Sequence, residues 1–188
     1  MSLFLIRHGT TTTSGQTFAG RSNVPLNDEG QRMAEDIMRD LAPLSIERVV
    51  SSPLSRAMET ARPLAEELGL DIETDPRLME FDFGVYEGRT KKELGLKLRK
   101  AHAHDPVPGG EALIDVWRRA GEFLASLQPS SAHVAVVGHY WLNRMIFGHV
   151  SCMDFDTACR CRKYRPNTGS IIELRFRDPS CTTLMSFR

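Results

Sequence analysis

The chain has 188 residues, of which 41% are hydrophobic and 26% are charged. These values are typical of one globular domain with a sizeable core, and we expect that domain to span residues 1–188. The 24 basic and 24 acidic side chains cancel, which argues against nucleic acid or an anionic membrane as a partner. No apolar run approaches the roughly 18 residues needed to cross a bilayer. Residues 1–9 lack the basic stretch and cleavage site of a signal peptide, so a cytoplasmic location is expected.

Apolar runs and helical spacing predict an alternation of strands and helices along the chain. In chain order these are a strand over 2–6, a helix over 25–41, a strand over 47–52, a helix over 53–68, a strand over 70–75, helices over 90–102 and 110–127, a strand over 133–139, a helix over 141–150, and strands over 169–177 and 182–187. The last two are expected to form a hairpin around Asp178 and Pro179. This alternation favours an α/β domain with a largely parallel sheet between helices.

Local signals define the ends of the first two helices. Asn27 is a suitable N-cap for the first, because its side chain can accept a hydrogen bond from a free backbone N–H. For the second, we expect Ser52 as the cap, Pro53 at the first helical position and Gly69 as the stop. Pro63 lies inside that helical pattern, so a kink or a break is predicted there.

Unusual polar residues follow three of the predicted strands. They are Arg7, His8 and Gly9 after the first strand, Ser51, Ser52 and Arg56 after the second, and Gly138 and His139 after the strand HVAVV. In an open α/β sheet, functional groups gather beyond the carboxyl ends of the strands. We therefore expect two histidines and two arginines to meet at one edge of the sheet.

Two arginines and two histidines at one edge indicate a phosphoryl site. Guanidinium forks match phosphate oxygens, and a glycine at position 9 allows the backbone to come close. Nearby cations should keep His8 neutral, so it can act as a nucleophile and form a phosphohistidine. Arg7, Arg56 and a protonated His139 would then stabilise the charge on the moving phosphoryl group. With this much fixed positive charge, neither a metal nor another cofactor is expected.

The leaving oxygen also needs a proton donor. The stretch LMEFDFGVYEG offers Glu80, Asp82 and Glu87 among aromatic side chains. A carboxyl group held beside aromatic residues and other acids can have its pKa raised toward the working pH. The residue types alone do not choose among the three.

Several blocks of the sequence resemble, in order, the signature blocks of the histidine phosphatase superfamily, in its phosphoglycerate mutase-like branch, which includes small phosphatases such as alpha-ribazole phosphatase. These blocks are LIRHGTT, SSPLSRAMETA, LMEFDFGVYEG, PGGEA and VVGH, with NTGS at residues 167–170 also similar. The resemblance implies a three-layer α/β/α sandwich, His8 as the phosphorylated nucleophile, and a phosphate pocket made by Arg7, Arg56 and His139. It also implies that Glu80, the first acid of E-x-x-x-G-x-x-E-G, is the proton donor.

The chain departs from that family pattern at two places. Many relatives read RHGETxxN, whereas this chain has Thr10 in place of the acid and Ser14 in place of the phosphate-contacting Asn. Ser14 can still donate a hydrogen bond to phosphate. The mutases of the family usually carry a longer segment after the Glu block and a longer chain, so the shorter chain here favours hydrolysis.

These observations predict a metal-independent phosphoric monoester hydrolase that acts on a small phosphorylated metabolite through a phosphohistidine on His8. Two alternatives remain open: a cofactor-dependent phosphoglycerate mutase-type phosphoryl transfer, and a catalytically silent phosphate-binding regulatory module. Residues 90–109 are expected to select the substrate. The sequence leaves the identity of that phosphate ester and the oligomeric state open.

Two further features have competing interpretations. The basic segment RCRKYR at residues 160–165 either contacts the distal part of a substrate or forms a mobile surface loop. The four cysteines at positions 152, 159, 161 and 181 are best explained as reduced thiols without a catalytic role. A metal or redox site is the weaker alternative, because the C-x-C spacing of Cys159 and Cys161 does not match common zinc motifs.

Overall fold

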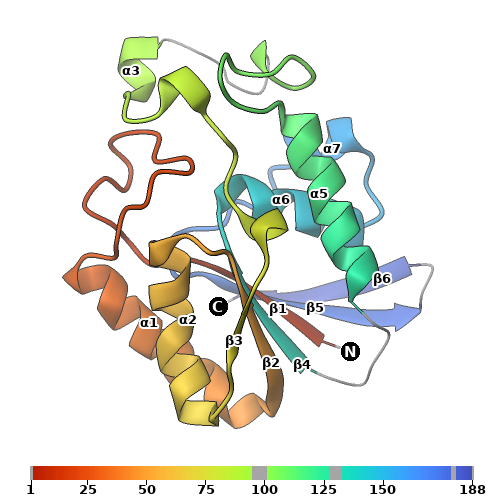
Figure 1. Cartoon of the computed structure of the whole chain (residues 1–188). Helices are drawn as coiled ribbons and strands as arrows, with labels where there is room; N and C mark the ends of the chain where they lie inside the picture. Colours follow the sequence, from red (N-terminus) through yellow and green to blue (C-terminus); the bar gives the residue numbers. More distant parts are fainter. Residues whose placement is uncertain (1, 95–100, 128–132, 179–180, 188) are drawn as a thin grey trace.

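The computed structural model describes residues 2–94, 101–127, 133–178 and 181–187. Their centre is a six-stranded sheet in the order β3-β2-β4-β1-β5-β6 (Figure 1). The strands are β1 (Ser2–Arg7), β2 (Ile46–Ser51), β3 (Ile72–Thr74), β4 (His133–Gly138), β5 (Ile171–Asp178) and β6 (Cys181–Phe187). Strands β1 to β4 pair in parallel, whereas β5 runs antiparallel to β1, and β6 antiparallel to β5. The predicted, mostly parallel α/β sheet with a closing hairpin is confirmed.

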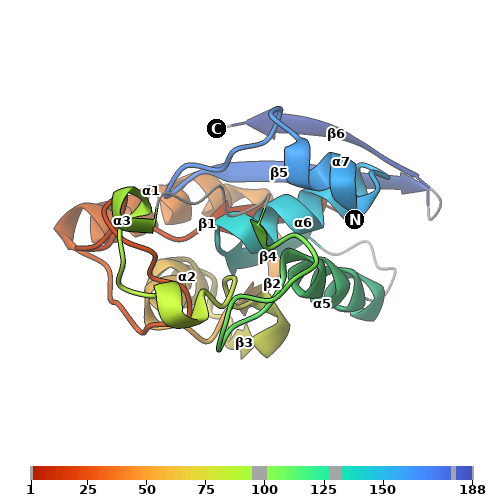
Figure 2. The same cartoon turned by 90° about the horizontal axis from the view of Figure 1, so that it is seen from above.

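Helices cover both faces of this sheet. They are α1 (Asp28–Leu41), α2 (Ser55–Leu68), α3 (Lys91–Leu94), α5 (Leu113–Ser126), α6 (Tyr140–Val150) and α7 (Phe155–Arg160), with short 3-10 turns η1 (Ala42–Leu44), η2 (Pro76–Leu78) and η3 (Gly84–Tyr86). Viewed from above, β3 and β6 lie at opposite edges of the sheet (Figure 2). Helix α7 was missed by the sequence analysis, and residues 95–100 of the helix expected over 90–102 lie outside the described residues.

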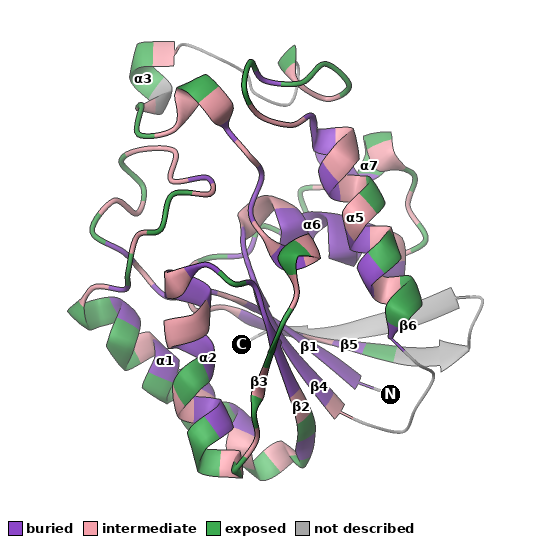
Figure 3. Ribbon diagram, viewed as in Figure 1, coloured by how far each residue is buried: buried purple, intermediate pink, exposed green. Residues whose placement is uncertain are grey.

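The strand β1 shows how the sheet separates two apolar cores. Successive side chains of a strand point to opposite faces. Leu3 and Leu5 therefore join the core beneath α5 and α6, whereas Phe4 and Ile6 join the core beneath α1 and α2. All four are buried, as the purple central strands in Figure 3 show. A strand that is apolar on both faces can only be an inner strand, which places the residues after it near the centre of the domain.

The cap predictions for α1 and α2 had different outcomes. Asn27 caps α1, with its side chain accepting a hydrogen bond from the Gly30 N–H at 2.8 Å. The prediction of Ser52 as the cap of α2 is wrong, because the helix begins at Ser55 after Leu54, which makes no side-chain cap. Pro63 lies inside α2 without breaking it, and Gly69 ends the helix with a positive φ of 63°.

Candidate active site

The carboxyl ends of three adjacent strands meet at the expected edge of the sheet. In the order β2-β4-β1, they are followed by Ser52, His139 and His8. A cavity of about 1380 Å³ opens above them, and its wall includes Arg7, His8, Arg56 and Glu80. The structure therefore brings together residues that are up to 132 positions apart in the sequence, as predicted from the strand ends.

His8 is held as a neutral imidazole with one defined tautomer. Its Nδ1 lies 2.7 Å from the Gly9 carbonyl oxygen. Because a carbonyl can only accept, Nδ1 carries the proton and Nε2 keeps its lone pair. Burial, then the charges of Arg56 and Arg7, hold the pKa of His8 well below its ordinary value. The unprotonated Nε2 is thus available as a nucleophile at neutral pH.

Arg56 is the partner of that nitrogen. The residue is 1% exposed, and its Nε–H donates to His8 Nε2 at 3.3 Å. Its two terminal nitrogens donate to the carbonyl oxygens of Ser22 at 2.8 Å and Gly20 at 2.7 Å. The loop before α1 therefore fixes the guanidinium beside the imidazole, where it can stabilise negative charge on a phosphoryl group.

Arg7 supplies a second guanidinium at the same end of the cavity. Its Nη1 donates to the Pro166 carbonyl at 2.9 Å, and its Cζ lies 5.3 Å from the centroid of the Tyr140 ring. Its Nε is buried without a hydrogen-bond partner among the described residues. A buried, unpaired donor is costly, so this nitrogen is suited to an anion in the cavity.

His139 lies behind His8 and is wholly buried. The two rings are 5.0 Å apart between centroids, and His139 Nε2 lies 2.8 Å from the Ser52 hydroxyl. The Ser52 hydroxyl also accepts from the Leu54 N–H at 3.4 Å, before α2 begins. Burial, together with Arg56, holds the pKa of His139 well below its ordinary value. This shift favours a neutral His139 in the protein alone, whereas the charge of a bound phosphoryl group would favour its protonation, so a protonated His139 during phosphoryl transfer stays a prediction.

Of the three candidate acids, Glu80 is the one on the cavity wall. Its carboxylate accepts from the backbone N–H groups of Phe81 at 2.8 Å, Tyr140 at 3.0 Å and Trp141 at 3.1 Å. The last two belong to the first turn of α6. Burial raises the pKa of Glu80, although these hydrogen bonds and the nearby arginines act in the opposite direction. A raised pKa suits a proton donor.

The other two acids have structural partners. Asp82 accepts from the Gly84 N–H at 3.0 Å and forms an ion pair with Arg21 at 3.4 Å. Glu87 accepts from the Arg21 N–H and the Ser22 hydroxyl, both at 2.6 Å. Glu87 thus holds the loop whose carbonyls bind Arg56. At the start of the next helix, it is Glu93 that accepts from the Thr90 N–H, at 2.7 Å.

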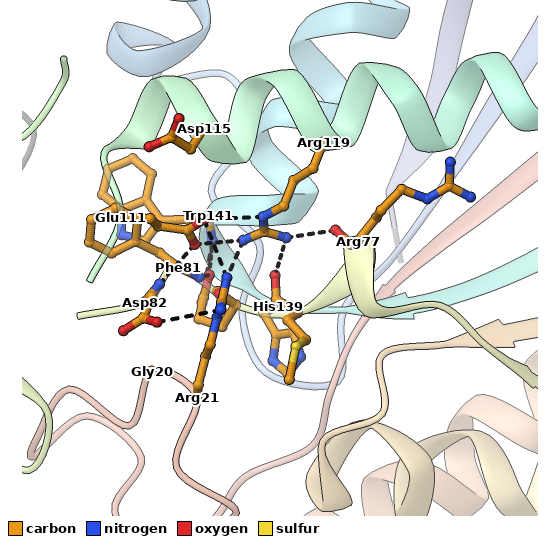
Figure 4. Close-up of polar contacts among 12 residues, drawn as sticks. Gly20, Arg21, Arg77, Phe81, Asp82, Glu111, Asp115, Arg119, His139 and Trp141 are labelled. Atoms are coloured by element: carbon orange, nitrogen blue, oxygen red, sulfur yellow. Dashed lines mark hydrogen bonds and ion pairs between the residues drawn. The ribbon is translucent and has the colours of Figure 1, made fainter. Parts of the chain in front are cut away.

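A network around the partly buried Arg119, which contacts the Glu80 backbone, was missed by the sequence analysis (Figure 4). Arg119 of α5 donates through Nη1 to the carbonyls of Arg77 at 2.6 Å and Met79 at 2.5 Å, and through Nη2 to the Glu80 carbonyl at 3.1 Å. Its charge is balanced by Glu111, 2.9 Å away. The only signal in the sequence was Glu111 in the PGGEA block, to which no role was assigned.

We expect Arg119→Met to lower kcat by about 10- to 100-fold with little change in KM, because the Glu80 backbone would lose its anchor and small displacements of a catalytic group have effects of this size. The matched control is Arg118→Met, because Arg118 is exposed and pairs only with Asp115 in the described structure. Steady-state kinetics with a phosphate monoester measures both constants. Equal kcat values for the two variants would show that Arg119 does not position Glu80.

Gly9 and Ser14 are the two predicted phosphate-binding residues that remain to be placed relative to the cavity. Gly9 is not on the cavity wall, and its N–H donates to the Thr60 hydroxyl at 3.0 Å. A Cβ at position 9 would lie 2.6 Å from the Gly30 carbonyl oxygen. The expectation that Gly9 binds phosphate is thus corrected: the glycine allows close packing against α1. Ser14 lines the cavity and accepts from the Thr11 N–H at 2.8 Å, and its contact with phosphate stays a prediction.

The structure gives limited support for a metal site, for a role of the cysteines, or for contacts between segment 90–109 and the cavity. Among the described residues, no group of three or more His, Cys, Asp and Glu side chains is arranged to hold a metal ion. Cys159 and Cys161 line the cavity. Within the described part of segment 90–109, Ala103 reaches the cavity wall. No helix of the described chain has the length and apolar character to traverse a membrane.

Comparisons with known proteins agree with this geometry. The model of the histidine phosphatase superfamily (branch 1) matches residues 3–186. The bifunctional protein Rv2228c of Mycobacterium tuberculosis is 39% identical over 147 residues, which are 73% of this chain but 40% of that protein. The chain thus spans less than half the length of that relative. The probable phosphoglycerate mutase GpmB of Salmonella choleraesuis is 32% identical over 149 residues, covering 74% of this chain and 69% of the mutase.

Two solved structures share the fold over nearly their whole length. The alpha-ribazole phosphatase from Shigella flexneri has a TM-score of 0.87 and 24% identity, covering 98% of this chain and 94% of that chain. The mycobacterial glucosyl-3-phosphoglycerate phosphatase Rv2419c, in complex with VO3, has a TM-score of 0.84 and 25% identity, covering 100% of this chain and 96% of that chain. These likenesses confirm the phosphoglycerate mutase-like α/β sandwich.

Proposed function

This chain belongs to the histidine phosphatase superfamily, and from that premise we propose that it is a metal-independent phosphatase of a small phosphorylated metabolite. The observation that carries the proposal is His8. Its unprotonated Nε2 accepts a hydrogen bond from the Arg56 Nε–H at 3.3 Å, and the residue lines the cavity. A neutral nitrogen nucleophile beside fixed cations is the arrangement that transfer of a phosphoryl group requires.

The first step forms a phosphohistidine. His8 Nε2 attacks the phosphorus atom, and a phosphorus–nitrogen bond forms as the ester phosphorus–oxygen bond breaks. Arg56 and Arg7 stabilise the charge on the phosphoryl oxygens. The leaving alkoxide takes the proton of the Glu80 carboxyl, so the alcohol departs neutral. Glu80 is then an ionised carboxylate, stabilised by the N–H groups at the start of α6.

The second step returns the enzyme to its starting state. The Glu80 carboxylate takes a proton from water as the water oxygen attacks phosphorus, and the phosphorus–nitrogen bond breaks. Inorganic phosphate leaves, His8 regains its lone pair, and Glu80 is again protonated. The same carboxyl group thus serves as acid and then as base, as microscopic reversibility requires.

Phosphoryl transfer to a second hydroxyl is the alternative favoured by one observation, the similarity to a probable phosphoglycerate mutase. The two alternatives share the phosphohistidine and differ in its acceptor. Two phosphatases among the solved structures support hydrolysis. Measuring free phosphate and isomerised ester in the same reaction distinguishes the two outcomes. A silent binding module would bind phosphate esters and produce neither.

We expect phosphate release to continue unchanged after treatment with EDTA, because guanidinium groups supply the positive charge at the site. A broad panel of phosphate monoesters, with colorimetric detection of phosphate, tests the activity. Rapid quenching in base, under which phosphohistidine survives, followed by peptide mass analysis, should place the modification on His8. Loss of activity in EDTA that returns on adding a divalent cation would contradict metal independence.

A further inference from the structure

We propose that the part of the cavity formed by residues 158–165 binds a second anionic group of the substrate, either a carboxylate or another phosphate, through Arg162 and Arg165. This inference rests on the proposed phosphatase function and names the class of substrate. Substrates would therefore be phosphate esters that carry a further negative charge away from the scissile phosphate.

The first support is the charge of the cavity wall. Six arginines and only two acids, Glu80 and Asp156, line it, although acidic and basic residues balance over the whole chain. Arg7 and Arg56 belong to the His8 end. This local excess of positive charge exceeds what one phosphate group needs, and a cavity of one sign concentrates ligands of the opposite sign.

The second support is that Arg162 and Arg165 are available. Asp156 is paired with Arg160 at 3.3 Å. Within the described chain, Arg162 and Arg165 make no ion pair or side-chain hydrogen bond, and both are exposed on the cavity wall. Two guanidinium forks without a carboxylate partner are suited to a carboxylate or phosphate ligand.

The third support is that the segment carrying these arginines is held in place. The buried Arg144 of α6 donates to four of its carbonyls, those of Ala158 at 3.2 Å, Cys159 at 3.1 Å, Cys161 at 2.9 Å and Tyr164 at 2.9 Å. The Tyr164 ring packs 4.8 Å from that of Phe147. These contacts favour the interpretation that residues 158–165 contact the distal part of a substrate. They argue against a mobile surface loop.

Tyr140 lies beside an arginine from each end of the cavity. The Tyr140 ring lies 5.3 Å from the Arg7 Cζ and 5.5 Å from the Arg144 Cζ, so a single side chain joins the phosphate end to the anchor of the 158–165 wall. Tyr140 and Trp141 also line the cavity. They offer aromatic surface to the carbon part of a substrate.

Binding of three related hexose phosphates tests the inference without requiring turnover. Glucose 6-phosphate has no second anion, 6-phosphogluconate adds a carboxylate, and fructose 1,6-bisphosphate adds a phosphate. Calorimetric titration uses the His8→Ala protein, which cannot form the covalent intermediate. We expect at least one of the doubly anionic ligands to bind about tenfold or more tightly than glucose 6-phosphate, with a preference that weakens as salt is added.

The matched variants add Arg162→Ala with Arg165→Ala, or Lys163→Ala, to the same protein. Lys163 is exposed in the same segment but is not on the cavity wall, so its variant should keep the preference. The double arginine variant should reduce it to within about twofold. Preference for only one doubly anionic ligand would assign the site to a carboxylate or to a phosphate.

Equal or undetectable binding of all three ligands, or a preference that survives loss of both arginines, would overturn the second anion site. Hydrolysis of p-nitrophenyl phosphate by the wild-type protein separates this result from failure of the proposed function. Hydrolysis without a preference for doubly anionic ligands refutes the second anion site alone. A preference for doubly anionic ligands without any hydrolysis refutes the phosphatase function and leaves the second anion site intact.

Discussion

Replacing His8 with alanine is expected to lower kcat/KM by about 10⁴-fold or more, because loss of a covalent nucleophile removes the whole two-step route. The imidazole has no substitute in the pocket. His139 is wholly buried behind it and its Nε2 is engaged with the Ser52 hydroxyl. Steady-state phosphate release measures the loss, and base-quenched peptide analysis should show no phosphohistidine in the variant.

The control for this experiment is His133→Ala, which removes a partly buried histidine at the start of β4, away from the cavity wall. It should retain activity within about twofold of the wild type. Circular dichroism and a cooperative unfolding transition would establish that His8→Ala is folded. Turnover within tenfold of the wild type in a folded His8→Ala protein would rule out the nucleophile assignment, and with it the phosphohistidine.

The pH dependence of the reaction should also report on His8. Its pKa is held well below the ordinary value by burial and by Arg56, so the nucleophile stays unprotonated through neutral pH. Protonation of His8 should therefore lower activity only when the solution becomes clearly acidic. The lowered pKa of His8 also makes the stability of the folded protein depend on pH. Because the folded pKa is below the unfolded one, the unfolded chain binds more protons, and the free energy of unfolding should decrease as pH falls below about 6.5.

The second large effect is expected for Glu80→Gln, which should lower kcat by roughly 10²- to 10⁴-fold for alkyl phosphates. Glutamine keeps the size of the side chain and can still accept from the N–H groups of Phe81 and Trp141, but it cannot donate a carboxyl proton. With p-nitrophenyl phosphate, whose leaving group is an acidic phenol that needs no proton, phosphorylation of His8 should be much less affected. A burst of p-nitrophenol followed by slow hydrolysis is therefore expected.

The rival acids provide the controls for Glu80. Asp82→Asn and Glu87→Gln disturb the contacts with Arg21 and Ser22 but should keep the ordinary dependence on the leaving group. The wild-type rate should fall as pH rises through the pKa of Glu80, which burial raises, because the donor must be protonated. Glu80→Gln should lack this alkaline decline. Equal loss of the rate of His8 phosphorylation with alkyl and nitrophenyl esters would contradict a proton donor at position 80.

Much of the active site was predictable from the sequence because its signals are local. An apolar strand followed by Arg7 and His8, and another followed by His139, identify carboxyl strand ends without knowledge of the fold. Parallel strands present their carboxyl ends at one edge of a sheet. The residues that follow these strands were therefore expected to lie close together. Asn27 was predictable for the same reason, since a cap and the N–H that it accepts are three residues apart.

The tertiary structure decided which of several equivalent side chains takes each role. Glu80 differs from Asp82 and Glu87 because it meets the start of α6, and its bond with the Tyr140 N–H joins residues 60 positions apart. Ser52 had the residue type of a helix cap but bonds with His139, 87 positions away. Such pairings depend on how strands and helices pack. Residue type and spacing along the chain therefore do not predict them. The sequence by itself indicated phosphoryl chemistry, and only packing distinguished Glu80 from the other two acids and brought Arg162 and Arg165 to the cavity wall.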